Sequence, residues 1–114
     1  MVKPSGLRMT MPTQAVLRGL LEHPTREMYG LQVCEAAGLP SGTVHPILAR
    51  LEGLGWLESR WEEVNPAEAG RPRRRYYRLS PDGAEQARHA LANARSPLAG
   101  LAGWTDNPAL GGAR

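Results

Sequence analysis

The sequence predicts a mostly α-helical domain that carries one small β-hairpin. Three stretches in the first half repeat apolar residues at helical spacing, two later stretches alternate as strands do, and a well-capped helix follows them. The chain has 114 residues, which is enough for one modest hydrophobic core. Its content of 41% hydrophobic and 22% charged residues is typical of a globular domain rather than a disordered chain.

Two helices are expected in the first third of the chain. Thr13 can cap the first, which continues through the apolar stretch "TQAVLRGLLEH" and ends before Pro24. Thr25 can cap the second, with residues 26–28 as its first turn, and Gly38 is a natural stop for it. Both starts rest on the same chemistry, in which a side-chain hydroxyl accepts a hydrogen bond from a free backbone N–H.

A third helix is expected after a short turn. Its regular part begins between Ser41 and Thr43, either of which can cap it, and it ends at Gly55. Pro46 requires such a nearby start, because a missing N–H is harmless only in the first turn, where it has no partner. The spacing of the apolar residues places one stripe toward the core: Val44, Ile47, Leu48, Leu51 and Leu54.

A β-hairpin and a fourth helix follow. The strands are expected in "WLESRWEE" and "RRRYYRL", with a turn-forming loop of about nine residues between them. Alternation along the second strand makes Tyr77 a core residue and leaves Tyr76 exposed. The last helix begins with Ser80 as its cap, Pro81 at the first helical position and Asp82 in the first turn.

This order of elements is that of a winged helix-turn-helix, in which the turn "AGLPSG" joins the second and third helices and the hairpin is the wing. The third helix buries its stripe, so its other faces and the flanking wing can contact double-stranded DNA. The candidate DNA-binding residues on the third helix are Ser41, Gly42, Thr43, His45, Pro46 and Arg50. The candidates on the wing are Arg71, Arg73, Arg74 and Arg75.

Positive charge is concentrated on the wing. Five arginines lie between Arg71 and Arg78, although the net charge of the whole chain is only +3. Such a cluster suits a phosphate backbone, but a solvated strand face would have the same sequence. His45 and Arg50 leave the same two interpretations open, namely DNA contact or plain exposure to solvent.

The chain resembles the PadR family of winged-helix transcriptional regulators in two blocks, "MYGLQVCEAAGLPSGTVHPILARLEGLGWLESRWEE" and "GRPRRRYYRLSPDGAEQAR". The resemblance covers residues 13–94. It implies a homodimer that binds a palindromic operator as a repressor, with much of the dimer contact supplied by the helix after the wing. The chain departs from the family at His45, where tyrosine is usual. Its short C-terminal part is similar to the smaller subfamily with one dimerisation helix.

The chain is therefore expected to have four parts: an N-terminal arm (1–12), the winged helix-turn-helix domain (13–79), the dimerisation helix (80–95) and a C-terminal tail (96–114). The expected partners are double-stranded DNA and a second copy of the chain. A winged-helix module whose basic wing binds an acidic protein is the alternative. The resemblance also allows a small-molecule effector of unknown identity, for which Trp104 is the candidate contact through aromatic stacking.

Neither an enzyme nor a metal or cofactor site is indicated. The histidines are far apart and Cys34 is the only cysteine, so zinc-ligand spacing is absent and no disulfide can form within the chain. Cys34 lies on an apolar helix side, which favours a core position over a redox sensor. Catalytic carboxylate pairs and phosphate-binding loops are not recognisable. The absence of a membrane-spanning stretch and of a signal peptide predicts a cytoplasmic protein without a membrane partner.

Overall fold

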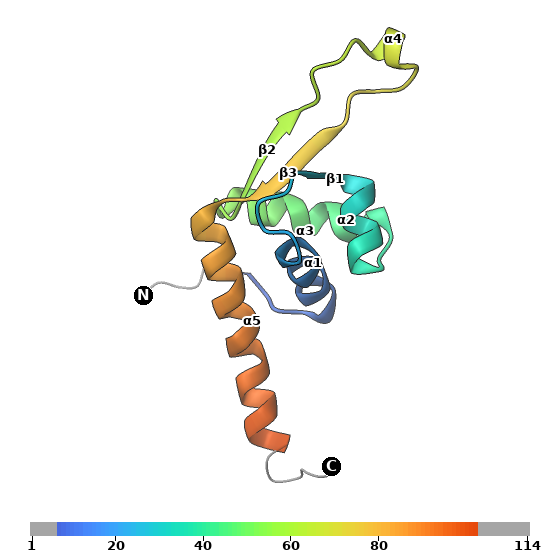
Figure 1. Ribbon diagram of the computed structural model, residues 1–114. Helices are drawn as coiled ribbons and strands as arrows, with labels where there is room; N and C mark the ends of the chain where they lie inside the picture. Colours follow the sequence, from blue (N-terminus) through green and yellow to red (C-terminus); the bar gives the residue numbers. More distant parts are fainter. Residues whose placement is uncertain (1–6, 103–114) are drawn as a thin grey trace.

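The computed structural model describes residues 7–102, with side chains through residue 94. In this part of the chain the helices are α1 (Met11–Leu21), α2 (Gly30–Ala37), α3 (Ser41–Gly53), α4 (Pro66–Ala69) and α5 (Pro81–Ala102). The strands are β1 (Met28–Tyr29), β2 (Leu57–Trp61) and β3 (Arg75–Leu79), which form one antiparallel sheet in the order β1-β3-β2. This arrangement confirms the predicted fold class of a mostly helical winged domain (Figure 1).

The hydrophobic core lies between the first three helices, one face of the sheet and the start of α5. The α3 stripe is buried as predicted, except that Leu54 is only partly buried. Cys34 and Tyr77 are also buried, as expected for core positions. Burying one leucine-sized side chain contributes about 2 kcal/mol, so the stripe holds α3 firmly in one rotational setting. The largest fully buried side chains are Leu17, Leu48, Leu51, Val16, Val33, Val44 and Thr13.

The start of α1 differs from the prediction. The helix begins at Met11, and Thr10 is its cap, with the Thr10 hydroxyl accepting from the Thr13 N–H at 3.3 Å. The prediction of Thr13 as the cap was wrong, because the helix includes Pro12, and proline is compatible with a first turn. Thr13 is instead 1% exposed within the helix.

The segment before α2 is a strand rather than a first helical turn. Met28 and Tyr29 form β1 and pair with Tyr77 and Tyr76 of β3. The predicted start after Thr25 was therefore wrong, because pairing with a distant strand overrides the local helix signal. The Gln32 side chain accepts from the Tyr29 N–H at 3.0 Å at the true helix start.

The turn between the end of α2 and the start of α3 lies where it was predicted. Gly38 has φ +71°, the left-handed conformation in which a helix commonly ends, as predicted. Helix α3 begins at Ser41, within the predicted window, but neither hydroxyl caps it; the Pro40 carbonyl accepts from the N–H groups of Thr43 and Val44 instead. The helix ends at Gly53, two residues before the expected stop.

Pro46 lies in the interior of α3 and not in its first turn. The missing N–H leaves the Gly42 carbonyl without its usual helical donor. Both residues are exposed, so water can solvate that carbonyl. The helix therefore tolerates this proline without a buried unpaired group.

The hairpin has the expected pairing but a longer connection. Leu57 pairs with Leu79 and Trp61 pairs with Arg75 across β2 and β3. Residues 62–74 connect the strands and include the short helix α4, which lies at the tip of the projecting wing (Figure 1). The predicted loop of about nine residues was too short, because β2 ends at Trp61 and β3 begins only at Arg75. Within the connection, the Asn65 side chain caps α4 by accepting from the Ala67 N–H at 2.9 Å.

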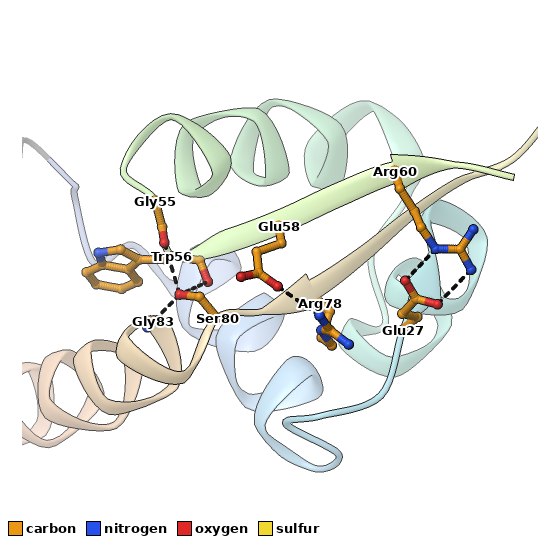
Figure 2. Close-up of polar contacts among 8 residues, drawn as sticks. All are labelled: Glu27, Gly55, Trp56, Glu58, Arg60, Arg78, Ser80 and Gly83. Atoms are coloured by element: carbon orange, nitrogen blue, oxygen red, sulfur yellow. Dashed lines mark hydrogen bonds and ion pairs between the residues drawn. The ribbon is translucent and has the colours of Figure 1, made fainter.

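The junction between the wing and α5 is a dense set of hydrogen bonds. The Ser80 hydroxyl accepts from the Gly83 N–H at 2.9 Å, which confirms the predicted cap, and donates to the Gly55 carbonyl at 3.0 Å. The Ser80 N–H also donates to the Trp56 carbonyl at 3.0 Å. These bonds tie the first turn of α5 to the segment that follows α3, and Figure 2 draws those of the Ser80 hydroxyl. Helix α5 then runs to Ala102, beyond the expected end at residue 95.

Replacement of Gly83 by alanine is expected to destabilise the domain. A Cβ at this position would overlap the Trp56 carbonyl oxygen and would lie 2.6 Å from the Trp56 Cα, so backbone would have to move. We expect the free energy of unfolding in urea to fall by about 2 kcal/mol or more. Gly53→Ala is the matched control, because a Cβ there meets no atom within 4 Å. Equal stability of the two variants would contradict this account of the junction.

Candidate nucleic-acid interface

The exposed side of α3 is built from small residues. At 100° per residue, Gly42, Pro46, Ala49 and Gly53 lie opposite the buried stripe, and all four are exposed. His45 and Arg50 are exposed on either side of them. A narrow surface of this kind lets the helix backbone approach the floor of a groove, while the two flanking side chains offer hydrogen-bond donors to base edges or phosphates.

The remaining predicted α3 residues lie at its N-terminal end. Ser41 is exposed in the first turn and Thr43 is half-buried. Neither hydroxyl is used as a cap, so both remain available for other hydrogen bonds. Of the six predicted α3 residues, five are therefore exposed and Thr43 is half-buried.

The His45 imidazole lies against the start of α2. A Cβ placed on Gly30 would lie 2.7 Å from the imidazole Cε1, so the ring occupies the space that this glycine leaves open. The contact holds the exposed imidazole between the starts of two helices. Sequence reasoning placed His45 correctly on the exposed side of α3 but did not connect it with Gly30.

Carboxylates pair with several of the wing arginines. Arg71 makes two hydrogen bonds to Glu62, at 2.7 and 2.9 Å. Arg75 donates to Glu52 at 3.1 Å and Arg78 donates to Glu58 at 3.0 Å. Much of the positive charge that the sequence concentrates in this region is therefore compensated within the fold.

Arg73 and Arg74 differ from these paired arginines. Within residues 7–94 neither has a carboxylate partner. The exposed Arg73 side chain donates from Nε to the Val64 carbonyl at 3.0 Å, which leaves its remaining N–H groups free for an anion. The Arg74 guanidinium lies 4.1 Å from the centre of the Tyr29 ring in a cation–π contact. The structure therefore separates four arginines that looked equivalent in the sequence.

Glu52 connects α3 to the near face of the wing. Its carboxylate accepts from the Ser59 hydroxyl of β2 and from Arg75 of β3. These hydrogen bonds, that from Ser59 first, lower the pKa of Glu52 below its ordinary value. Because side chains alternate along a strand, Trp61 shares this α3-facing side with Ser59 and Arg75.

The opposite face of the wing carries a second cluster. The Tyr29 and Tyr76 rings meet edge to face with centroids 5.9 Å apart, and the Arg60 guanidinium lies 5.0 Å from the Tyr76 ring centre. Arg60 also makes two hydrogen bonds to Glu27, at 2.7 and 2.8 Å (Figure 2). Sequence reasoning missed this carboxylate partner, because Glu27 precedes β1 and Arg60 lies on β2, and these two strands meet only when both pair with β3.

Glu62 organises the base of the wing loop. The two hydrogen bonds from Arg71, and then that from the Arg74 backbone N–H, lower the pKa of its carboxyl to about 2. The Glu62 N–H also donates to the Arg74 carbonyl at 2.8 Å, which extends the strand pairing past β2. The loop that presents Arg73 is thus closed by an ion pair and by backbone hydrogen bonds.

A hollow of about 370 Å³ lies between the N-terminal segment, Trp56 and α5. Leu7, Met9, Ala90 and Ala94 supply its apolar lining, and Gln86, His89 and Asn93 supply polar atoms. Trp104, the predicted effector contact, lies outside the residues that the structure describes. Between residues 7 and 102, no helix combines the length and the apolar character needed to cross a membrane.

A small-residue helix face beside a basic wing, both carried on a helix-turn-helix core, is the architecture of winged-helix DNA-binding domains. The chain belongs to the PadR-like family of transcriptional regulators, whose model matches residues 19–89. This membership confirms the family resemblance noted in the sequence. Transcriptional regulation through DNA binding is the function of this family, and the family is not one of enzymes.

Solved structures of similar fold include several regulators. A PadR-like transcription factor from Bacteroides fragilis matches at 22% identity and a TM-score of 0.62, over 83% of this chain and 90% of the other. A PadR family regulator from Clostridium difficile R20291 matches at 19% identity and a TM-score of 0.59, over 81% of this chain and 97% of the other. BpsR of Bordetella bronchiseptica, whose DNA binding is regulated by 6-hydroxynicotinic acid, matches at 17% identity and a TM-score of 0.65, over 94% of this chain and 74% of the other. At these identities the likeness establishes the fold.

The ion pair at the wing base predicts a pH response. The Glu62 pKa is depressed from an ordinary value of 4.5 to about 2, so its contribution to the closed loop is complete above about pH 4.5 and is lost as the pH falls toward 2. NMR titration of the Glu62 carboxyl carbon should show this pKa directly. In Arg71→Ala the pKa should rise toward 4.5, because the main stabilising donor is gone; an unchanged value would refute the assignment.

Proposed function

We propose that the protein is a transcriptional repressor that binds a palindromic operator as a homodimer. The observation that carries the proposal is the exposed small-residue face of α3, which lies beside a wing whose Arg73 has no carboxylate partner among the described residues. The first can enter a major groove and the second can contact the flanking phosphates.

The exposed side of α3 would read the bases. Gly42 and Pro46 allow the helix to approach the bases closely. His45 and Arg50, on either side of these small residues, would donate to base edges. The hydroxyls of Ser41 and Thr43 do not cap the helix, and they would contact phosphate at the edge of the groove. These roles follow from exposure and position along the helix.

The wing would position the protein without reading sequence. Arg73 supplies the main phosphate contact, because its charge is not compensated by a neighbouring carboxylate in the described part of the chain. Arg71 and Arg75 keep the wing in place through Glu62 and Glu52 and add weaker phosphate contacts at their exposed edges. Arg74 contributes from the opposite face, where it packs on Tyr29.

Helix α5 would form the contact between two copies. It leaves the winged domain as a long helix that projects away from the core (Figure 1). Its partly buried Ala90 and Leu91, together with the apolar lining of the adjacent hollow, provide surface that a second α5 can cover. A two-fold dimer would present two α3 helices to half-sites about 34 Å apart, which requires a palindromic operator.

Binding of the purified protein to DNA from upstream of its own gene tests this proposal. Sequence-selective binding that survives excess random competitor, together with one dimer per footprint and lower expression from the bound promoter, is expected. Binding that random DNA removes equally would refute the operator choice. A failure to bind any duplex even at low salt would favour the alternative, a wing that binds an acidic protein partner.

Arg73→Ala is expected to weaken binding to every duplex. The loss of one phosphate contact should reduce the slope of log K against log salt by about one unit, for specific and random DNA alike. Arg18→Ala is the charge-matched control, because this exposed arginine is on α1, which contributes no residue to the wing or to the α3 face. If both variants shifted the slope equally, Arg73 would have no special contact with DNA.

His45→Ala is expected to relax preference at particular base pairs. The loss of one base-edge contact should cost about 1–3 kcal/mol on the operator and much less on random DNA. Competition binding against operators mutated one base pair at a time measures this effect. A uniform loss on all duplexes would place His45 on the phosphate backbone.

A further inference from the structure

Trp61 is a large side chain that the wing leaves open to solvent. At the end of β2 it is 56% exposed, whereas Trp56, a few residues earlier, is 9% exposed and belongs to the core. An exposed indole forgoes the hydrophobic free energy that a covering surface would supply. The fold does not use Trp61 for its core, so the question is which surface would cover it.

The position of Trp61 is defined by the strand register. It pairs with Arg75, and its side chain lies on the same side of the sheet as Ser59. Both of those residues contact Glu52 of α3. The indole therefore lies on the side of the wing that is turned toward α3, and not with Arg60 and Tyr76 on the opposite side.

Positive groups flank the indole. The Arg75 guanidinium lies 5.0 Å from the centre of the Trp61 ring, in a cation–π contact. Arg73 and Trp61 line the same open hollow, together with Glu62, Glu63, Val64, Asn65 and Pro66. Glu62 is paired with Arg71, which leaves Glu63 as the exposed acid of this hollow. An apolar ring that contacts one guanidinium and shares a hollow with another fits a surface on which apolar and anionic groups alternate closely.

We infer that Trp61 packs against a deoxyribose of the DNA backbone next to the groove that α3 occupies, with Arg73 on the adjoining phosphate. The sugar offers an apolar face within reach of phosphate charge, and every nucleotide has one, so this contact adds affinity without sequence preference. A protein partner of mixed apolar and acidic surface is the competing occupant. The inference rests on the proposed function, because it requires that DNA lie along α3.

Binding of the full chain to a random-sequence duplex of about 20 base pairs at low salt tests the inference without knowledge of the operator. Trp61→Ala should weaken binding about tenfold, which is the scale of one aromatic contact to a nucleotide, and Trp61→Phe should recover most of that loss. The salt slope should not change in Trp61→Ala, because no charge is removed. Arg73→Ala is the matched comparison, since it should lower the slope by about one unit.

Fluorescence provides a second readout at the residue itself. The difference in emission between the wild type and Trp61→Phe isolates the Trp61 signal. Acrylamide should quench that signal in the free protein and should quench it much less when the duplex is bound, because the sugar covers the ring.

The outcomes separate the inference from the proposed function. Tenfold weaker binding at constant salt slope, with protection from acrylamide, supports the sugar contact. Wild-type affinity in Trp61→Ala, or unchanged quenching in the complex, overturns it while leaving DNA binding intact. A reduced salt slope in Trp61→Ala also overturns it, because the residue would then only support the wing. If the wild type binds no duplex at all, the proposed function fails and the inference with it.

Discussion

The burial of one side of α3 is the interaction on which the rest of this structure depends. Val44, Ile47, Leu48 and Leu51 lie in the core, each at 5% exposure or less, so the helix has only one rotational setting. The residues at intervening positions follow from that setting, with the small stripe outward and Glu52 toward the sheet. A change in the rotation of α3 would therefore alter both the surface that we propose to face DNA and the attachment of the wing.

The charges of the wing show why a count of basic residues describes this surface poorly. Arg71, Arg75 and Arg78 each donate to a carboxylate of the same fold, so the cluster supports local structure as much as it attracts an anion. These are partly exposed pairs, and each adds little to global stability. Their main effect is geometric: the wing loop and its strands are held in one arrangement before any partner arrives, which lowers the entropic cost of binding.

Helix α5 follows the last strand of the wing after a single residue, Ser80. Ser80 accepts from the Gly83 N–H in the first turn and donates to the carbonyls of Gly55 and Trp56, immediately after α3 (Figure 2). The close packing at Gly83 leaves no room for a side chain, so the angle at which α5 leaves the domain is tightly restricted. In the proposed dimer, that angle would set the distance between the two α3 helices.

Local signals in the sequence were sufficient for much of the fold. The α3 stripe, the Ser80 cap and the alternation of the two hairpin strands were predicted and observed, because each depends on residues a few positions apart. Capping at the N-terminus was less well determined, since Thr10 and Thr13 are both competent caps and the helix is compatible with Pro12 in its first turn.

For the candidate DNA-binding site, too, the sequence predicted only what depends on residues a few positions apart. Exposure of His45, Pro46 and Arg50 follows from helical phase, so the sequence by itself determined which side of α3 is available. Only the tertiary structure decided that Met28 and Tyr29 form a strand, and which wing arginines are paired with carboxylates. The physical reason is that partners such as Glu27 and Arg60, or Glu52 and Arg75, are far apart in the sequence and meet only after distant segments have packed together. Local sequence patterns do not show which distant segments will do so.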